Sequence, residues 1–353
     1  METVIVTGAH GLIGSEAAKF FGLKGYHVVG IDNDMRSYFF GPSASTTKSK
    51  ESLHSLGIKY THYDIDIRDQ LKLDELFKKY GHNTYAVIHT AAQPSHDWAA
   101  KEPLTDYSVN STATLYLLES YRRYCPHSRF VYTSTNKVYG DNPNKIALIE
   151  GDYRYTPVEP SYRDYGIDES MSIDMCTHSL FGASKLSADL YVQEYGRYFD
   201  LNTVCLRGGC LTGPAHSGAQ LHGFLSYLVL CAVNKNPYTV FGYKGKQVRD
   251  NIHSHDFVSA IWNYCNAPRP GKVYNMGGST HSNVSMLEAI QKIEDISGCR
   301  LEYSVSENNR VGDHIWYVSD VRKFQADYPD WKYEYNIDSI LKEMIEVAKN
   351  DCS

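Results

Sequence analysis

The sequence predicts an α/β fold in which a doubly wound parallel sheet, covered by helices on both faces, is followed by a smaller C-terminal α/β domain. Two observations support this fold class. Short β-rich runs alternate with helical patterns through the first two-thirds of the chain, which is typical of βαβ units. After Arg207 the pattern changes to Gly/Pro-rich turns and isolated helices.

The apolar runs and the helical periodicity place the expected elements in order. The expected strands are Thr3–Val6, His27–Asp32, Lys59–Asp64, Tyr85–His89, Arg129–Thr133 and Asn202–Arg207. The expected helices of the sheet domain are Ile13–Leu23, Leu71–Tyr80, Ser108–Tyr124 and Leu186–Phe199. Later helices are expected at Gly223–Asn234, Met286–Ser297 and Ile337–Ala348.

We expect two domains along the chain. Residues 1–207, with 250–275 returning to them, form the first expected domain, which contains the parallel sheet, and residues 208–249 and 276–353 form the second, smaller domain. The segment Tyr139–Cys176 is long, polar and rich in Pro, Asp and Tyr. A loop of that length is usually functional or contains short elements of its own.

Bulk composition excludes several classes of protein. The chain has 353 residues and a net charge of −6, so it lacks the basic field of a nucleic-acid binder. Its longest apolar run, residues 224–233, is too short to span a bilayer, and the N-terminus begins as a strand without a basic leader. The eight cysteines have no metal-ligand spacing. We therefore expect a cytoplasmic protein with no metal site, no nucleic-acid partner and no membrane association.

The run TGAHGLIG at 7–14 follows the first strand and opens the first helix. Gly8, Gly11 and Gly14 permit a tight turn and a close approach of the backbone to a pyrophosphate at the helix N-terminus. Asp32 ends the second strand, where a carboxylate binds the adenosine ribose and repels a 2′-phosphate. These features predict a Rossmann-like domain that binds NAD rather than NADP, although Arg36 could reach toward a phosphate.

Further motifs make the chain resemble the extended short-chain dehydrogenase/reductases, specifically the nucleotide-sugar epimerases and dehydratases. STNKVYGD with GKQVRD most resembles the CDP-paratose/CDP-tyvelose 2-epimerases within that group. The motifs of the resemblance are TGAHGLIG, Asp32, DIRD at 66–69, HTAAQ at 89–93, TSTNKVYGD at 133–141, FGASK at 181–185, GKQVRDNIHSHD at 245–256 and RVGD at 310–313.

The resemblance implies a set of cofactor-binding residues. One of them, Asn110, has a second interpretation, in which its side chain satisfies backbone groups between a helix and a strand and does not contact the cofactor. The implied NAD-binding residues are Gly8, Gly11, Leu12, Ile13, Gly14, Asp32, Asn33, Asp66, Ile67, Ala91, Ala92, Gln93, Asn110, Thr133 and Lys185.

The resemblance also implies residues that bind the substrate. Thr135 matches the residue that hydrogen-bonds the sugar hydroxyl being oxidised, although it could be a plain strand residue. Asn136 and Lys137 stand where dehydratases carry an acidic pair, which disfavours dehydration. The implied substrate-binding residues are Ser134, Asn136, Lys137, Gln247, Arg249 and Arg310, with Lys246 and His253 near them; Cys210 replaces a common family asparagine.

The usual catalytic tyrosine of the family is missing, because the motif HSLFGASK has Phe181 four residues before Lys185. Three explanations remain open: another group transfers the proton, Thr135 and water suffice, or the protein binds its ligands without catalysis. We favour the first, with Thr135 and Lys185 assisting. The candidate replacements are His96 and Asp97 in the loop after the fourth strand, and then Cys176, His178 and Tyr165.

The function expected from the resemblance is an NAD-dependent nucleotide-sugar epimerase that oxidises its substrate to a keto sugar and returns the hydride, with C2 of a CDP-hexose as the expected position. The first expected domain would bind NAD, and the second would bind the nucleotide sugar. Such an enzyme would serve carbohydrate biosynthesis, for example that of lipopolysaccharide. The alternatives are a 4-epimerase or dehydrogenase of a UDP- or dTDP-sugar, or a non-catalytic binding protein. A homodimer through Ser108–Tyr124 and Leu186–Phe199 is expected.

Overall fold

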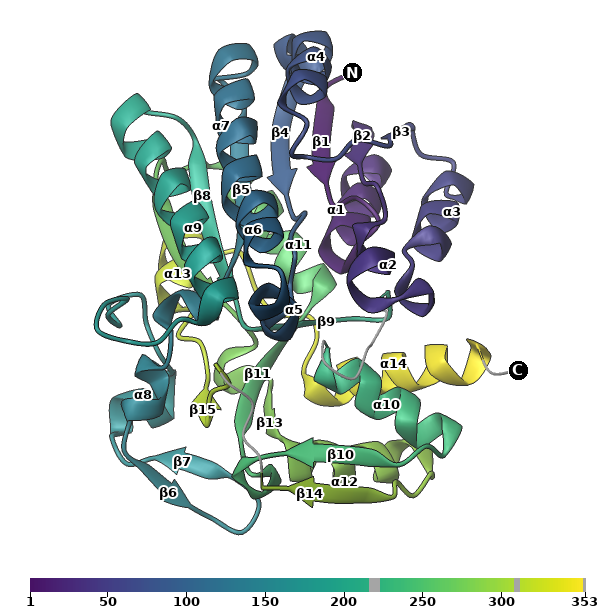
Figure 1. The fold of residues 1–353 in the computed structure, drawn as a ribbon, viewed down its shortest axis with the longest axis vertical. Helices are drawn as coiled ribbons and strands as arrows, with labels where there is room; N and C mark the ends of the chain where they lie inside the picture. The colour runs from purple at the N-terminus through teal and green to yellow at the C-terminus, as the bar shows by residue number, and fades with distance from the viewer. Residues whose placement is uncertain (216–222, 308–311, 352–353) are drawn as a thin grey trace. The chain divides into compact units, whose positions relative to one another are not determined.

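In the computed structural model, a seven-stranded sheet has the order β12-β8-β5-β4-β1-β2-β3 (Figure 1). The structure describes residues 1–215, 223–307 and 312–351. The neighbours β1, β2, β3, β4 and β5 pair in parallel, with Val6 opposite Gly30 and Ile88. The strands are β1 (Thr3–Thr7), β2 (His27–Ile31), β3 (Tyr60–Tyr63), β4 (Thr84–His89), β5 (Arg129–Thr135), β8 (Thr203–Gly208) and β12 (Lys272–Met276).

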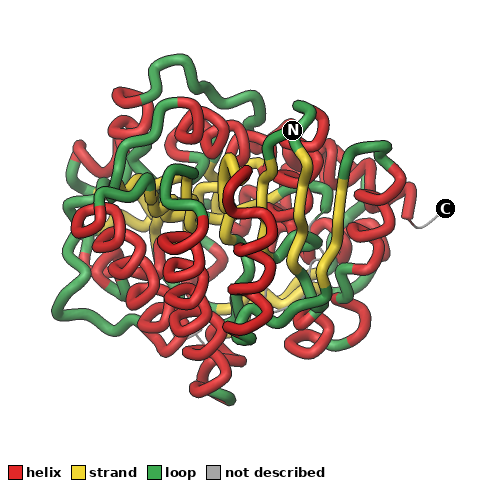
Figure 2. The backbone as a smooth tube through the Cα atoms, turned by 90° about the horizontal axis from the view of Figure 1, so that it is seen from above, coloured by secondary structure: helices red, strands yellow, loops and turns green. Residues whose placement is uncertain are grey.

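Helices cover both faces of this sheet, as a doubly wound fold requires (Figure 2). Phe77 of α4, Leu117 of α7 and Val192 of α9 belong to the core on one face. Elsewhere the Trp262 ring of α11 packs against the Phe21 ring of α1, with ring centroids 5.7 Å apart. The helices are α1 (Leu12–Leu23), α2 (Met35–Phe40), α3 (Thr47–Ser55), α4 (Gln70–Tyr80), α5 (His96–Lys101), α6 (Pro103–Tyr107), α7 (Ala113–Tyr124), α9 (Ser179–Phe199) and α11 (Ser254–Asn266). Short turns of helix are η1 (Pro42–Ala44), η2 (Gly81–Asn83), η3 (Ser108–Thr112, a π-helix) and η4 (Asn136–Tyr139).

A second unit contains smaller sheets and a core of three helices. Its central strand β11 pairs with β9 and β15 in parallel and with β13 in antiparallel orientation. The strands are β6 (Leu148–Glu150), β7 (Tyr155–Pro157), β9 (Cys210–Thr212), β10 (Tyr238–Phe241), β11 (Val248–His253), β13 (Asn283–Ser285), β14 (Tyr303–Ser306) and β15 (Trp316–Tyr317). The helices are α8 (Pro160–Tyr165), α10 (Phe224–Asn234), α12 (Met286–Ser297), α13 (Arg322–Asp327) and α14 (Ile337–Asp351), with short turns η5 (Asn142–Lys145), η6 (Tyr243–Gly245) and η7 (Ser279–His281).

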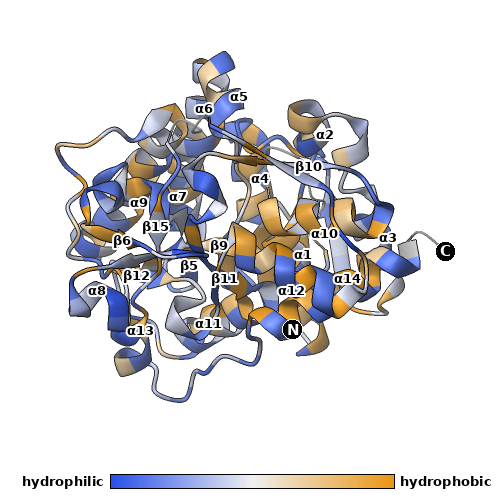
Figure 3. Cartoon of the chain, turned by 90° about the horizontal axis from the view of Figure 1, so that it is seen from below, coloured by the Kyte–Doolittle hydropathy of each residue, from blue (hydrophilic) through white to orange (hydrophobic). Residues whose placement is uncertain are grey.

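The second unit's core forms because α12 and α14 are amphipathic, with hydrophobic and hydrophilic residues alternating along both helices (Figure 3). Their apolar faces bury Ile293 and Leu341 against Leu228 of α10. A capping box fixes where α12 begins, since Ser285 Oγ accepts from the Glu288 N–H and the Glu288 carboxylate accepts from the Ser285 N–H.

The predicted fold class is confirmed, and the predicted strands appear in the seven-stranded sheet with ends shifted by no more than two residues. The first unit comprises 1–138, 180–207 and 258–274, and the second 139–179, 208–257 and 275–353. Residues 139–179 therefore group with the second unit, whereas the sequence predicted them within the NAD-binding domain. The segment contains β6, β7 and α8, so it is not a plain loop. The roles of the two units stay predictions.

Candidate active site

The turn between β1 and α1 leaves no space for a side chain at Gly8 or at Gly14. Gly8 has φ +66°, and a Cβ there would lie 2.7 Å from the backbone N of Ala91. A Cβ on Gly14 would collide with the carbonyl oxygen of Gly8. The N-cap residue Gly11 offers no side chain to the first turn of α1, so no N-cap side chain bonds the leading N–H groups at Leu12 and Ile13. This cradle fits the pyrophosphate of a dinucleotide.

Asp32 lies directly after β2 and is held by its surroundings. Its carboxylate accepts from the backbone N–H groups of His10 and Asp34, both at 2.9 Å. Burial raises the pKa of Asp32, and the two N–H bonds oppose that shift. A carboxylate has about four acceptor positions, so two remain for ribose hydroxyls.

His10 is a residue of this site that the sequence reasoning missed, although it lies inside the glycine motif itself. Its side chain is buried, Nε2 lies 2.8 Å from the Tyr60 hydroxyl, and its ring lies 4.7 Å from that of His62. Burial lowers the pKa of His10 to about 3, with repulsion from His62 adding to the effect. The neutral imidazole thus ties the glycine turn to β3.

The remaining predicted adenosine contacts lie after β2 and β3. Asn33 is half-buried beside Asp32, and Ile67 is buried. Arg68 holds Asp66 through Nη2 at 2.6 Å and Nε at 3.0 Å. The guanidinium of Arg36 lies 5.0 Å from the ring of Phe40, a cation–π contact that directs it along its own helix.

Gln93 and Asn110 form the centre of a buried polar network. The Gln93 N–H donates to Asn110 Oδ1 at 2.9 Å, and Asn110 Nδ2 donates to the Gln93 carbonyl at 3.0 Å. Asp106 Oδ1 accepts from Gln93 Nε2 at 2.7 Å and from Asn110 Nδ2 at 2.9 Å. Asn110, in η3, therefore satisfies backbone groups of the loop after β4. In that loop the half-buried Ala91 and Ala92 precede Gln93. A π-turn such as η3 often marks a functional site.

Lys185 and Phe181 lie one turn apart on α9. Lys185 is buried, its Nζ donates to the Thr133 carbonyl at 2.8 Å, and it lies 4.2 Å from the centre of the Tyr132 ring. Burial lowers the pKa of Lys185 to about 7, while the nearby carboxylate of Asp189 acts in the opposite direction. The ring of Phe181 contacts that of His96 edge-on, with centroids 4.9 Å apart. The Thr133 hydroxyl is buried without a hydrogen-bond partner among the described residues.

β5 ends at Thr135, and Asn136 and Lys137 follow it in η4. Thr135 Oγ1 accepts from the Lys137 N–H at 3.2 Å. Ser134 instead faces inward: its hydroxyl donates to Asp189, which also pairs with Arg207 at 2.8 Å. The Ser134 side chain therefore belongs to a buried ion-pair cluster and does not share the partner of the Thr135 hydroxyl.

The predicted substrate residues of the second unit lie on and before β11. Arg249 is buried and pairs with Asp313 at 2.6 Å, and Gln247 Nε2 donates to the Phe241 carbonyl at 3.2 Å. Lys246 pairs with Glu150 at 2.8 Å. The ring of His253 stacks on Tyr335 with centroids 3.9 Å apart, an arrangement that suits packing. Arg310 lies outside the described residues.

The other candidate bases belong to the second unit and are engaged there. Burial raises the pKa of the Cys176 thiol, and its Sγ lies 3.4 Å from His178 Nε2. His178 Nε2 also bonds the Ile173 carbonyl at 2.8 Å. Tyr165 is exposed, and its ring lies 3.7 Å from the Arg322 guanidinium.

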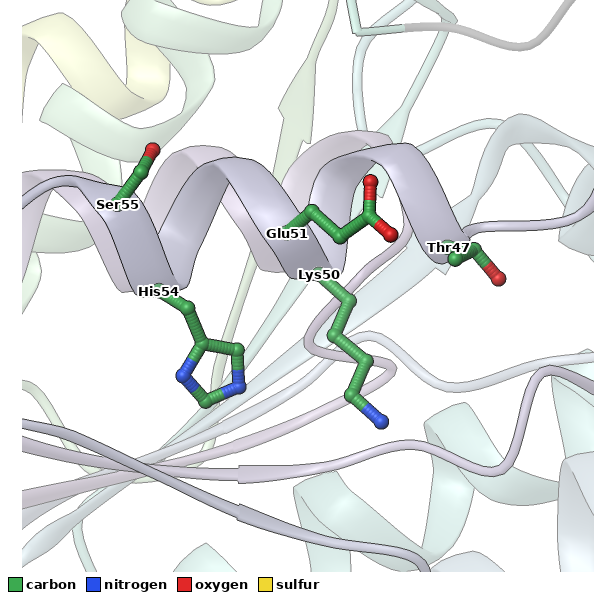
Figure 4. Close-up of a pocket in the computed structure, with 5 residues that line it drawn as sticks. All are labelled: Thr47, Lys50, Glu51, His54 and Ser55. Carbon is green, nitrogen blue, oxygen red and sulfur yellow. The ribbon is translucent and has the colours of Figure 1, made fainter.

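A hollow of about 540 Å³ lies along α3 and contains none of the predicted site residues (Figure 4). Thr47, Lys50, Glu51, His54 and Ser55 line it, and all five come from one surface helix. A single helix face supplies no converging polar groups, so we do not place the active site there. The described residues contain no group of three or more His, Cys, Asp or Glu side chains that could hold a metal.

A glycine turn after the first strand and a carboxylate after the second strand of a doubly wound parallel sheet are typical of dinucleotide-dependent enzymes of the Rossmann class. The chain belongs to the NAD dependent epimerase/dehydratase family, whose model matches residues 4–277. This confirms the predicted family, NAD as cofactor and an enzyme of the epimerase/dehydratase class.

Similarity to individual proteins extends over nearly the whole chain. The chain is 30% identical to a CDP-paratose 2-epimerase from Salmonella typhi over 97% of this chain and 98% of that protein. It is 24% identical to dTDP-glucose 4,6-dehydratase 1 of Escherichia coli over 97% and 91%. Its fold matches a UDP-glucose 4-epimerase of Thermus thermophilus in complex with NAD, with a TM-score of 0.77, 22% identity and 98% coverage of both chains. Among the described residues, no helix has the length and apolarity needed to cross a membrane.

Proposed function

We propose that the protein is a nucleotide-sugar epimerase that inverts C2 of a CDP-hexose. The observation that carries this proposal is the similarity to the Salmonella typhi CDP-paratose 2-epimerase along the full length of both chains. Asn136 and Lys137 support epimerisation over dehydration, because they put no carboxyl group at the two places where dehydratases carry an acidic pair.

The chain's own residues are suited to hold NAD. The Gly8–Gly14 cradle would take the pyrophosphate, Asp32 the adenosine ribose, and Lys185 the nicotinamide ribose. When bound, NAD supplies a hydride acceptor and donor for the sugar carbon. Thr135 at the end of β5 would hydrogen-bond the sugar hydroxyl and orient it toward a base.

Arginine in the second unit supports a diphosphate-containing substrate. Arg249 is buried and oriented by Asp313 on one side and by the Val248 carbonyl on the other. A guanidinium held in this way matches the geometry of phosphate oxygens. Gln247, whose Oε1 is buried without a hydrogen-bond partner among the described residues, would contact the same ligand, as would Arg310.

The proposal is tested by incubating the purified protein with CDP-, UDP- and dTDP-hexoses and following the products by NMR in D2O. We expect inversion at C2 of a CDP-sugar with no solvent deuterium at that carbon, since the hydrogen removed as hydride returns from the same cofactor. Inversion at C4 of a UDP- or dTDP-sugar, as the similarity to a UDP-glucose 4-epimerase 2 of Arabidopsis thaliana would suggest, contradicts the position and the nucleotide.

Phe181 favours one second candidate, a protein that binds NAD and a nucleotide sugar without turnover. This candidate predicts retention of NAD on purification, measurable binding of a nucleotide sugar by calorimetry, and no conversion across the panel. Any stoichiometric excess of product over protein excludes it.

We also propose a homodimer formed through α9 and α7. The two helices adjoin, since Tyr195 of α9 donates to Glu119 of α7 at 2.7 Å; in η3, which precedes α7, Ser111 lies 2.8 Å from Ser187 of α9. The outer side of α9 exposes Leu190, Tyr191 and Tyr198. Exposed apolar residues that gather in one patch mark protein interfaces, and we propose that these three residues contribute to such a patch. Cytoplasmic location and a role in lipopolysaccharide synthesis stay predictions.

A further inference from the structure

Phe181 of α9 stands where the resemblance places a catalytic tyrosine, and its side chain cannot transfer a proton. Phe181 is buried at 7% exposure, and Lys185 follows one helical turn later with its Nζ bonded to the Thr133 carbonyl. A tyrosine at this position beside a lysine would form an acid/base pair. Any proton transfer therefore needs a group that reaches the same place from another element.

His96 reaches that place. It is the first residue of α5, and its half-buried imidazole contacts the Phe181 ring edge-on with centroids 4.9 Å apart. The loop that carries it leaves the carboxyl end of β4, the edge at which Rossmann-type sheets bind their ligands. Imidazole is the side chain best suited to proton transfer near neutral pH.

A buried network fixes the loop of His96 to the helix of Phe181. Ser95 caps α5, and its N–H and carbonyl both bond the side chain of Gln93. Gln93 and Asn110 converge on Asp106. From Asn110, Nδ2 donates to Ser184 Oγ at 3.1 Å, and Ser184 Oγ donates to the Phe181 carbonyl at 3.0 Å. The members of this loop–helix network are Gln93, Ser95, Asp106, Asn110 and Ser184, all no more than 3% exposed.

The neighbouring candidate is placed less well. Asp97 is exposed in the first turn of α5, where the helix dipole stabilises a negatively charged carboxylate.

We propose that His96 is the acid/base residue of the epimerase, with the loop–helix network positioning it against Phe181. This inference rests on the proposed function. When bound, NAD would supply the hydride acceptor and donor for a carbinol carbon of the sugar. The His96 imidazole would take the proton as the O–H bond of that carbinol breaks and a carbonyl forms. The keto sugar would then present its opposite face, and the His96 imidazolium would return the proton to the oxygen as the carbon regains its hydride, so the carbon is inverted and no further oxidant is needed.

The test compares His96→Ala and His96→Gln with the exposed-histidine control His82→Ala. Melting temperature and NAD content are measured first, and the less perturbed of the two His96 variants is taken forward. We expect kcat to fall about 10²- to 10⁴-fold for that variant, with the His82 variant unchanged. If kcat stays within threefold of wild type, the inference is overturned and the proposed function stands. If wild-type protein converts no sugar, the proposed function fails and the inference fails with it.

Rescue separates chemistry from structure. In Phe181→Tyr/His96→Ala, the cavity left by the imidazole gives the new hydroxyl room beside Lys185. We expect the double variant to recover at least about tenfold in kcat over His96→Ala, because a tyrosine–lysine pair can transfer the proton instead. A double variant no faster than His96→Ala overturns the proton-transfer role.

The positioning role of Asp106 has its own test. Asp106→Asn keeps an oxygen that can accept from Gln93 and Asn110, whereas Asp106→Leu does not. We expect the Leu variant to lose about tenfold or more in kcat with KM little changed, and the Asn variant to retain most activity. Equal loss in both variants, or loss confined to KM, overturns this role.

Discussion

Two glycines in the turn between β1 and α1 differ in what a side chain would meet. A Cβ on Gly14 would overlap the Gly8 carbonyl, whereas on Gly11 the nearest atom would be 3.4 Å away and φ is −72°. We expect Gly14→Ala to lower the free energy of unfolding by about 2 to 4 kcal/mol, because backbone must move. Gly11→Ala should cost less than about 1 kcal/mol and still weaken NAD binding, since the methyl group enters the phosphate cradle.

Urea unfolding and NAD titration of both glycine variants check this. Equal destabilisation by the two alanines would contradict the close approach of the Gly8 carbonyl oxygen to position 14. Normal NAD affinity in Gly11→Ala would contradict the position of the pyrophosphate.

Lys185 gives the NAD-free protein a pH dependence of stability. Its pKa is about 7 in the folded chain, and an unfolded lysine has a pKa of about 10.4. Between these values the unfolded state binds more protons, so stability rises with pH, by up to about 1.4 kcal/mol per pH unit. Below pH 7 both states are protonated, and the cost of the buried ammonium is fully present.

Chemical unfolding at several pH values from 7 to 10 measures this effect. Wild type should gain stability relative to Lys185→Met across that window, whereas Lys19→Met, at an exposed position of α1, should run parallel to wild type. Parallel curves for wild type and Lys185→Met would mean that the lysine is not buried as described.

At the scale of elements, a buried ion pair joins α9 to β8. Asp189 is fully buried and receives Arg207 through Nη2 at 2.8 Å and Nε at 3.2 Å, with Gln193 donating at 2.6 Å. Removing one partner leaves a buried charge without its counter-ion, which costs about 3 to 5 kcal/mol. We expect Arg207→Leu and Asp189→Leu each to destabilise by that amount.

The double variant Arg207→Leu/Asp189→Leu completes the cycle. It should cost clearly less than the sum of the single changes, because neither charge remains. Additive losses in urea unfolding would show that the two side chains act separately.

Elements with strong periodicity were predictable from the sequence, and those without it were not. Met286–Ser297 was predicted with its observed bounds because a capping serine and an amphipathic pattern agree there. By contrast, α9 begins at Ser179 rather than at the predicted Leu186, because the Gly and Ser of FGASK read as helix breakers while packing holds them in the helix. The π-turn η3 has no sequence signature and depends on Asn110 bonding to Gln93.

The candidate site was predictable to a similar extent. Gly8, Gly11 and Gly14 were predictable from their spacing after the first strand, and Asp32 from its place at the end of the second strand. Gln93 and Ser134 turn inward to partners far along the chain, Asp106 and Asp189, which a local pattern does not reveal. His10 and Asp106 were missed, although their positions, within the glycine motif and four residues before Asn110, were available signals.

For the whole molecule, the predicted homodimer has a sharp test. Tyr198 is 80% exposed on α9, and Leu190, about two turns earlier on the same helix, is 42% exposed. Glutamate at both positions would place charges in an apolar interface and should shift the protein to monomer in light scattering, without loss of melting cooperativity. Leu71→Glu, at a residue 77% exposed on α4, is the matched control and should leave the oligomeric state unchanged. A dimer that persists in the double variant would place the interface elsewhere, and a monomeric wild type would exclude it.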